Sequence, residues 1–226
     1  MGNDSMRRRS LLGCFIAVVV PSASAGSYED FFEAAIRNDG RTIARLLERG
    51  FDPNTLDPKG QTALIIAVRE PSPDVIDALL QSPKTRVEQR NTKDESPLMI
   101  AAIKGNLALV KTLIARDADV NKPGWTPLHY AVTGNPPDQL AIMRVLLDSS
   151  AYIDAASPNG TTPLMMAAYY GSEDAVQLLL DEGADPRLKN QQGLTALDFA
   201  SRSQRKSVVD RITVAIQRMQ PNRGKW

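Results

Sequence analysis

The stretch that decides the fold is residues 160–168, which read Gly-Thr-Thr-Pro-Leu-Met-Met-Ala-Ala. Thr162 is suited to cap a helix, because its hydroxyl can accept a hydrogen bond from a free backbone N–H group. Pro163 suits the first helical position, since proline has no N–H group for the helix to leave unbonded. The alanines that follow are small, so they let a neighbouring helix approach closely. The stretch therefore predicts a short helix packed tightly in a stack.

The same pattern recurs along most of the chain. Its Thr or Ser anchors stand at positions 62, 96, 126, 162 and 195, so the successive spacings are 34, 30, 36 and 33 residues. A pair of bulky aliphatic residues follows each of the first four anchors: Leu79-Leu80, Leu113-Ile114, Leu146-Leu147 and Leu179-Leu180. One helix pair alone cannot bury its apolar face, but stacked neighbours can. The spacing therefore predicts a repeat solenoid.

This pattern resembles the ankyrin repeat, whose motif carries Thr-Pro-Leu-His-x-Ala at a period of 33 residues. Five copies are in phase, and an earlier partial unit ends at Gly50, so the resemblance covers about residues 28–217. It implies an all-α ankyrin-repeat solenoid of stacked helix-turn-helix units with short β-hairpin fingers. We assign residues 26–217 to this domain, with about six repeats including the terminal caps.

Departures from the period predict loops of altered length. The spacing from 96 to 126 is three residues short, and only Lys122-Pro123-Gly124 separate Asn121 from Trp125, which predicts a truncated finger. The spacing from 126 to 162 is three residues long, and we place the extra residues at 134–138, between the two helices of one repeat. One further extra residue falls near 82–84.

The first 25 residues have the order of a signal peptide. Three arginines at 7–9 precede an apolar run at 11–20, which is too short to span a bilayer permanently. Ala23-Ser24-Ala25 has the small-residue pattern that signal peptidase recognises. We expect cleavage after Ala25, which leaves Gly26 as the new N-terminus, and export to the periplasm. Residues 218–226 are expected to form a flexible tail.

Two alternatives for the leader stay open. Leu11-Leu12-Gly13-Cys14 resembles a lipobox, although most of the apolar run follows Cys14, so lipid anchoring there is the less favoured reading. Arg8-Arg9-Ser10-Leu11-Leu12 loosely resembles a twin-arginine signal, so the export route is undecided. The mature chain has no Cys and no other apolar stretch approaching 18 residues, so we expect neither a disulfide nor a stable membrane span.

Composition argues against nucleic-acid binding and against most kinds of catalysis. Lys and Arg total 27 and Asp and Glu total 26, without the basic surplus that phosphate binding needs. One His and one Cys cannot build a zinc site, and no P-loop, dinucleotide-binding or nucleophile-elbow motif is present. We expect no enzyme activity, cofactor or metal; a carboxylate-dependent hydrolase is the alternative. His129, the only imidazole, is expected to bond within its loop–helix junction, as the resemblance implies.

The resemblance implies that the concave face, built from fingertips and first helices, binds another protein. Four apolar residues fall on positions of that face: Ile103, Trp125, Tyr169 and Tyr170. Four charged residues join them as candidates: Arg69, Lys93, Glu95 and Lys104. Trp and Tyr dominate the binding energy of many interfaces. In the alternative interpretation, Trp125 covers the gap left by the short finger and one Tyr packs between repeats.

We therefore expect an exported, monomeric ankyrin-repeat protein that binds a protein partner through its concave face. A resemblance to exported bacterial ankyrin proteins implies a role in envelope stress protection. An inhibitor or immunity-type protein for a secreted enzyme would present the same kind of surface, and so would a secreted, host-directed effector.

Overall fold

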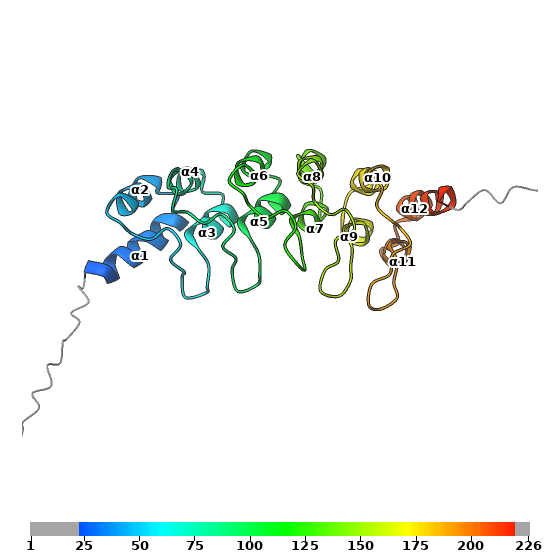
Figure 1. The fold of residues 1–226 in the computed structure, drawn as a ribbon, viewed down its shortest axis with the longest axis horizontal. Helices are drawn as coiled ribbons and strands as arrows, with labels where there is room; N and C mark the ends of the chain where they lie inside the picture. The colour runs from blue at the N-terminus through cyan, green and yellow to red at the C-terminus, as the bar shows by residue number, and fades with distance from the viewer. Residues whose placement is uncertain (1–22, 220–226) are drawn as a thin grey trace, which may run out of the picture.

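The computed structural model describes residues 23–219, which form an elongated stack of six helix-turn-helix pairs (Figure 1). The repeat solenoid predicted from the spacing is confirmed, and so is the all-α architecture that the resemblance implies. In chain order the helices are α1 (Ala23–Ile36), α2 (Gly40–Glu48), α3 (Ala63–Arg69), α4 (Pro73–Gln81), α5 (Pro97–Lys104), α6 (Leu107–Ile114), α7 (Pro127–Ala131), α8 (Gln139–Asp148), α9 (Pro163–Tyr170), α10 (Glu173–Asp181), α11 (Ala196–Arg202) and α12 (Lys206–Arg218).

The helices form two layers, with the fingers projecting from one of them. Figure 1 shows the even-numbered helices along one edge, the odd-numbered helices below them, and loops hanging from the odd-numbered layer. Within residues 23–219 the fingers are loops without extended strands, and one isolated antiparallel bridge, between Leu56 and Thr62, closes the first of them. The odd-numbered helices and the fingers therefore present one long, continuous face.

The repeated Thr and Ser anchors cap the first helix of each pair from the second to the sixth. Thr162, for example, has an extended backbone and accepts a hydrogen bond from the N–H group of Met165. Thr62, Ser96, Thr126 and Thr195 cap their helices in the same way. Each such cap stabilises a helix by about 1 kcal/mol, so short helices of five to eight residues can form where tertiary packing supports them.

One apolar core runs the length of the stack. The alanines at the helix–helix contacts are fully buried: Ala101, Ala102, Ala131, Ala167 and Ala168. The bulky residues of the second helices, such as Leu113, Leu146 and Leu179, are equally buried. The alanines of the first helices let neighbouring repeats approach closely, and the leucines of the second helices pack in the core between the layers.

The loops of altered length lie where the spacing predicts them. From Asn121 to Thr126 the chain advances five positions, whereas from Asp154 to Thr162 it advances eight, and Figure 1 shows the finger before α7 shorter than its neighbours. Seven residues, 132–138, connect α7 to α8, compared with two between α5 and α6. The buried side chain of Gln139 anchors the inserted loop. Its Nε2 donates hydrogen bonds to the carbonyl oxygens of Ala131 and Gly134, at 3.0 and 2.9 Å.

A ladder of polar side chains links the first five repeats to one another through backbone groups. Its members are Asn54, Glu88, Asn121 and Asp154. Asn121 accepts a hydrogen bond from the Tyr152 N–H group at 2.8 Å and donates one to the Ser150 carbonyl at 2.7 Å. Asn54 makes the equivalent pair of bonds two repeats earlier. An asparagine thus satisfies both a donor and an acceptor of the following repeat.

Asp154→Asn is expected to stabilise the fold by about 1 kcal/mol at neutral pH, because an amide can make both bonds of the ladder. The Asp154 carboxylate accepts from the Asp185 N–H group at 3.2 Å but has no hydrogen to donate. Burial raises the pKa of Asp154, and the nearby Asp185 charge raises it further. The cost of ionised Asp154 therefore disappears as pH falls through its folded pKa toward 3.8, so the advantage of the variant should shrink there.

Urea unfolding of both proteins at pH 7 and near pH 4 measures this difference. The reverse change, Asn121→Asp, is the matched control and should destabilise the protein. An Asp154→Asn chain no more stable than wild type at pH 7 would contradict this account of the ladder.

The leader and the tail lie mostly outside the described residues. Residues 1–22, including Cys14 and most of the expected signal peptide, are not described, and α1 begins at Ala23, so the expected cleavage point falls in its first turn. Of the expected tail, only Arg218 at the end of α12 and Met219 are described. Within residues 23–219, no helix combines the length and apolar character that crossing a bilayer requires.

Candidate protein-binding groove

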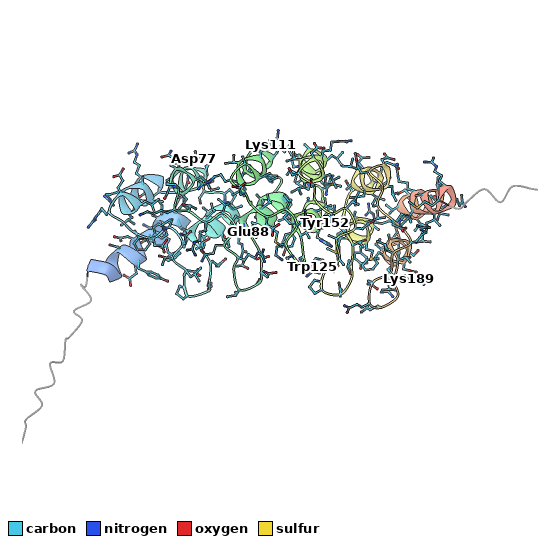
Figure 2. The ribbon with its side chains drawn as sticks, in the orientation of Figure 1. Asp77, Glu88, Lys111, Trp125, Tyr152 and Lys189 are labelled. Atoms are coloured by element: carbon cyan, nitrogen blue, oxygen red, sulfur yellow. The ribbon has the colours of Figure 1, made fainter. Side chains whose placement is uncertain are left out.

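The most apolar candidate site is a hollow of about 250 Å³ at the middle of the stack, which we call the central hollow. Its walls come from the end of α5, the shortened finger, α7 and the residues after it, and α9. The residues that line it are Ile103, Trp125, His129, Tyr130, Thr133 and Met166. Trp125 contributes from the finger that precedes α7 (Figure 2). The structure thus brings together residues from three consecutive repeats.

Trp125 is half-buried and forms one wall of the central hollow. Its indole meets the His129 imidazole edge-on, with ring centroids 5.3 Å apart and an interplanar angle of 80°. The two interpretations from sequence both capture part of this arrangement, because Trp125 packs down at the shortened finger and still faces the open side. It can therefore contact a partner without a large loss of side-chain freedom.

Tyr169 and Tyr170 extend the apolar surface toward the C-terminal end. They follow Met166 by three and four positions on α9, so they lie one helical turn from a wall of the central hollow. The two rings are 4.4 Å apart, and Tyr169 also meets Phe199 of α11 at 6.4 Å. Both side chains remain exposed, Tyr169 at 38% and Tyr170 at 54%. They are available for contact with a partner.

Arg69 and Glu95 form an ion pair that is bonded to Tyr130, a wall residue of the central hollow. Arg69 donates to the Glu95 carboxylate at 2.8 Å, and the Tyr130 hydroxyl donates to its other oxygen at 3.4 Å. Burial raises the pKa of Tyr130 to about 12, with the Glu95 charge as the next cause. Tyr130 therefore stays protonated at neutral pH and keeps this bond. Arg69 and Glu95 are not among the residues that line the central hollow; they form an ion pair joined to its wall through Tyr130.

The remaining charged candidates are not gathered at the central hollow. Lys93 is exposed on the finger before α5, and none of the ion pairs among residues 23–219 includes it. Lys104 lines a separate hollow beside Pro71 and Asn106, near the turns between helices. Although Lys104 follows Ile103 directly in sequence, the two residues face different hollows because consecutive residues of an α-helix point about 100° apart.

Sequence reasoning missed Tyr130 and Met166 as wall residues. Both occupy the variable position of Thr-Pro-Leu-His-x-Ala, and that position faces the central hollow in both repeats. The variability of this position was the signal that could have identified them. The neighbouring Met165, by contrast, is buried in the core.

His129 links two repeats and is not arranged for catalysis. Its Nδ1 accepts from the Thr126 N–H group at 3.2 Å and lies 2.9 Å from the Thr126 hydroxyl, while Nε2 lies 2.9 Å from the Thr161 carbonyl. A carbonyl can only accept, so the hydrogen is on Nε2. Burial, followed by the charge of Lys122, lowers the pKa of His129 to about 4. The imidazole is therefore neutral at pH 7, with both nitrogens engaged.

The family to which the sequence matches has this architecture. The chain matches the family described as "Ankyrin repeats (3 copies)" over residues 31–123, 83–157 and 138–217. These matches cover most of the chain, so the protein belongs to the ankyrin-repeat family. Repeats of this family form a protein-interaction module. Within residues 23–219, no group of three or more His, Cys, Asp or Glu side chains could hold a metal ion.

Two curated relatives from mouse share the repeat region. The chain is 33% identical to the nuclear factor NF-kappa-B p105 subunit over 156 residues, which are 66% of this chain and 16% of that protein. It is 34% identical to the B-cell lymphoma 3 protein homolog over 170 residues, 72% of this chain and 37% of that protein. The chain therefore spans well under half of these relatives.

A solved structure is similar over a larger share of its length. It is the Bd0816 predatory endopeptidase from Bdellovibrio bacteriovorus in complex with immunity protein Bd3460. The match has a TM-score of 0.71 and 26% identity, and it covers 85% of this chain and 98% of the matched chain. The similarity thus extends over nearly all of the matched chain.

Proposed function

We propose that this chain is an exported binding protein whose central hollow receives one large apolar side chain of a folded protein partner. The observation that carries the proposal is the size and lining of the hollow. Its volume of about 250 Å³ lies below the roughly 300–1,000 Å³ of small-molecule sites. Pockets lined by aromatic residues and closed to water by their surroundings are typical of interface hot spots.

We further propose that the partner is a secreted hydrolase and that binding blocks it, as an immunity protein would. The specific support is the solved neighbour, which comes from a complex between an endopeptidase and an immunity protein and is matched over 98% of its length. A binding face fixed on rigid repeats suits an inhibitor, because little ordering cost accompanies binding. Envelope protection follows from this proposal when the hydrolase acts on the producing cell.

Affinity capture from an envelope extract of the native host tests the binding face. The bait is the chain from Gly26, paired with a Trp125→Ala/Tyr169→Ala/Tyr170→Ala variant. An Asp77→Ala/Lys111→Ala bait, altered on the even-numbered helices (Figure 2), is the matched control. We expect one protein to be enriched by the wild-type and control baits and lost with the aromatic variant. Equal capture by all three baits would contradict the proposed face.

Inhibition is tested separately on the captured protein. Its hydrolytic activity should fall when an equimolar amount of this chain is added and should stay unchanged when the aromatic variant is added instead. A partner that stays fully active when bound would overturn the immunity-type proposal. It would not contradict the proposal that the partner binds at the central hollow.

The export proposal is supported by the order of basic, apolar and small residues in the leader. Mass spectrometry of the periplasmic form should give a chain that begins at Gly26. A membrane-bound form with a lipid on Cys14 would support anchoring instead, and a cytoplasmic chain that keeps the leader would contradict export.

A further inference from the structure

The regular fingers all close with the same backbone hydrogen bond. In each, the residue just before the helix cap offers its carbonyl to the N–H group of the residue four positions earlier. The four pairs are Asp57 N–H to Gln61 at 2.8 Å, Asn91 N–H to Glu95 at 3.1 Å, Ser157 N–H to Thr161 at 3.0 Å and Asn190 N–H to Leu194 at 3.0 Å. A regular finger thus satisfies this carbonyl with its own backbone.

The shortened finger satisfies the same carbonyl with a side chain. Trp125 precedes the cap Thr126, and its carbonyl accepts from Nζ of Lys122 at 2.9 Å. The same ammonium donates to the Pro123 carbonyl at 3.0 Å and to the Asp94 carboxylate at 2.5 Å. An ammonium has three hydrogens, so its hydrogen-bonding capacity is fully used.

Lys122 is unusual for a lysine in being completely buried. Its side chain is 0% exposed, whereas lysines are almost never fully buried unless they are paired. Its partner Asp94 lies on the neighbouring finger in the left-handed backbone region, with φ of +60°, and also accepts from Arg90 at 3.4 Å. The bond from Lys122 holds the pKa of Asp94 below its usual range, so the Asp94 carboxylate is ionised at neutral pH.

Trp125 is consequently held from two sides. Lys122 fixes its carbonyl, and the indole packs edge-on against His129, which is itself bonded to Thr126 and Thr161. Without the Lys122 bond, a loop with three residues removed would leave the Trp125 and Pro123 carbonyls without their donor. A part-buried polar group that loses its partner is destabilising, so we expect the backbone of the finger to shift and the indole to move with it.

We propose that Lys122 is a positioning residue of the binding groove: its ammonium replaces the missing finger and sets the Trp125 indole as a wall of the central hollow. The functional consequence rests on the proposed function, because it matters when a partner enters the hollow. The placement of Trp125 itself can be measured without any partner, so failure of the two proposals can be distinguished.

Tryptophan fluorescence of the Lys122→Met variant tests the placement. A Trp226→Phe background leaves Trp125 as the sole tryptophan, since the chain has two. Methionine keeps the length and apolar stem of lysine but provides no donor. We expect a red-shifted emission maximum and stronger quenching by acrylamide than in the parent chain. Affinity for a captured partner should fall by about tenfold.

A finger exchange provides the rescue. Residues 122–124 are replaced with segment 155–160, which restores the regular length, keeps Trp125 before the cap and supplies a backbone donor in place of Lys122. We expect the emission and quenching of Trp125 to return toward those of the parent. Lys111→Met, an exposed lysine on α6, is the matched control and should leave Trp125 unchanged.

The emission and quenching of Trp125 decide whether Lys122 positions this residue. Unchanged Trp125 emission and quenching in a folded Lys122→Met chain would overturn it. If Lys122→Met does not fold, the finger exchange decides alone: parent-like emission supports the role of the carbonyl bond, and a red shift overturns it. Circular dichroism identifies which case applies.

Discussion

Trp125→Ala is expected to weaken binding of the captured partner by at least about 30-fold, because a central, well-packed aromatic residue contributes roughly 2 kcal/mol or more to an interface. The indole forms one wall of the central hollow, and removing it leaves that wall open to water. Ile103 and Met166 would then no longer enclose the side chain that enters. Most of the loss should appear as faster dissociation.

Calorimetric or surface-based titration of the partner measures this loss. Trp125→Phe keeps an apolar ring of smaller size and should show an intermediate loss. Tyr152→Ala is the matched control, since Tyr152 is 68% exposed and does not line the central hollow (Figure 2). Equal losses of affinity in the Trp125→Ala and Tyr152→Ala chains would contradict the assignment of the central hollow as the binding site. Thermal unfolding of each variant confirms that the stack itself is unchanged.

The fold could be predicted because its determinants are local. Thr162 and Pro163 start a helix through groups within one turn, and the structure shows the expected cap at every anchor. Loop lengths follow from counting between anchors, so the short finger before Trp125 and the insertion at 134–138 were also predictable. Neither inference requires knowledge of where a side chain points.

The site was less predictable because it depends on contacts between repeats. Ile103 and Trp125 were identified from their positions, but Lys104 turns toward another hollow at the end of α5. The burial of Lys122 depends on Asp94, 28 positions earlier on the neighbouring finger. The three-residue deletion shows that a finger donor is missing, but the sequence alone does not show that a lysine replaces it.

His129 is a second residue whose role in the stack depends on contacts between repeats. Its ring joins the cap of α7 to the finger of the next repeat through Thr161. Lys122 supplies both the bond that closes the short finger and a charge that lowers the pKa of His129. The neutral state of His129 thus depends in part on a residue of the shortened finger.

Mild acid is therefore expected to destabilise the protein through His129 by roughly 3 kcal/mol between neutral pH and pH 4. Burial lowers the pKa of His129 from 6.5 to about 4, so between these values the unfolded chain binds a proton that the folded chain does not. The contribution of His129 to stability is therefore complete above about pH 6.5 and is lost as pH falls toward 4. Asp154, whose pKa is raised, changes in the opposite direction in acid.

Urea unfolding from pH 7.5 to pH 4 measures this dependence, and His129→Gln supplies the comparison. Glutamine can accept from Thr126 and donate to Thr161 but does not titrate, so the variant should lose some stability at pH 7 and much of the slope between pH 6.5 and 4. His129 is the only histidine, so other imidazoles cannot produce that slope. Parallel pH profiles for the two chains would show that His129 is not the group responsible. A steeper profile for wild type would instead identify protonation of this inter-repeat link as a cause of acid unfolding.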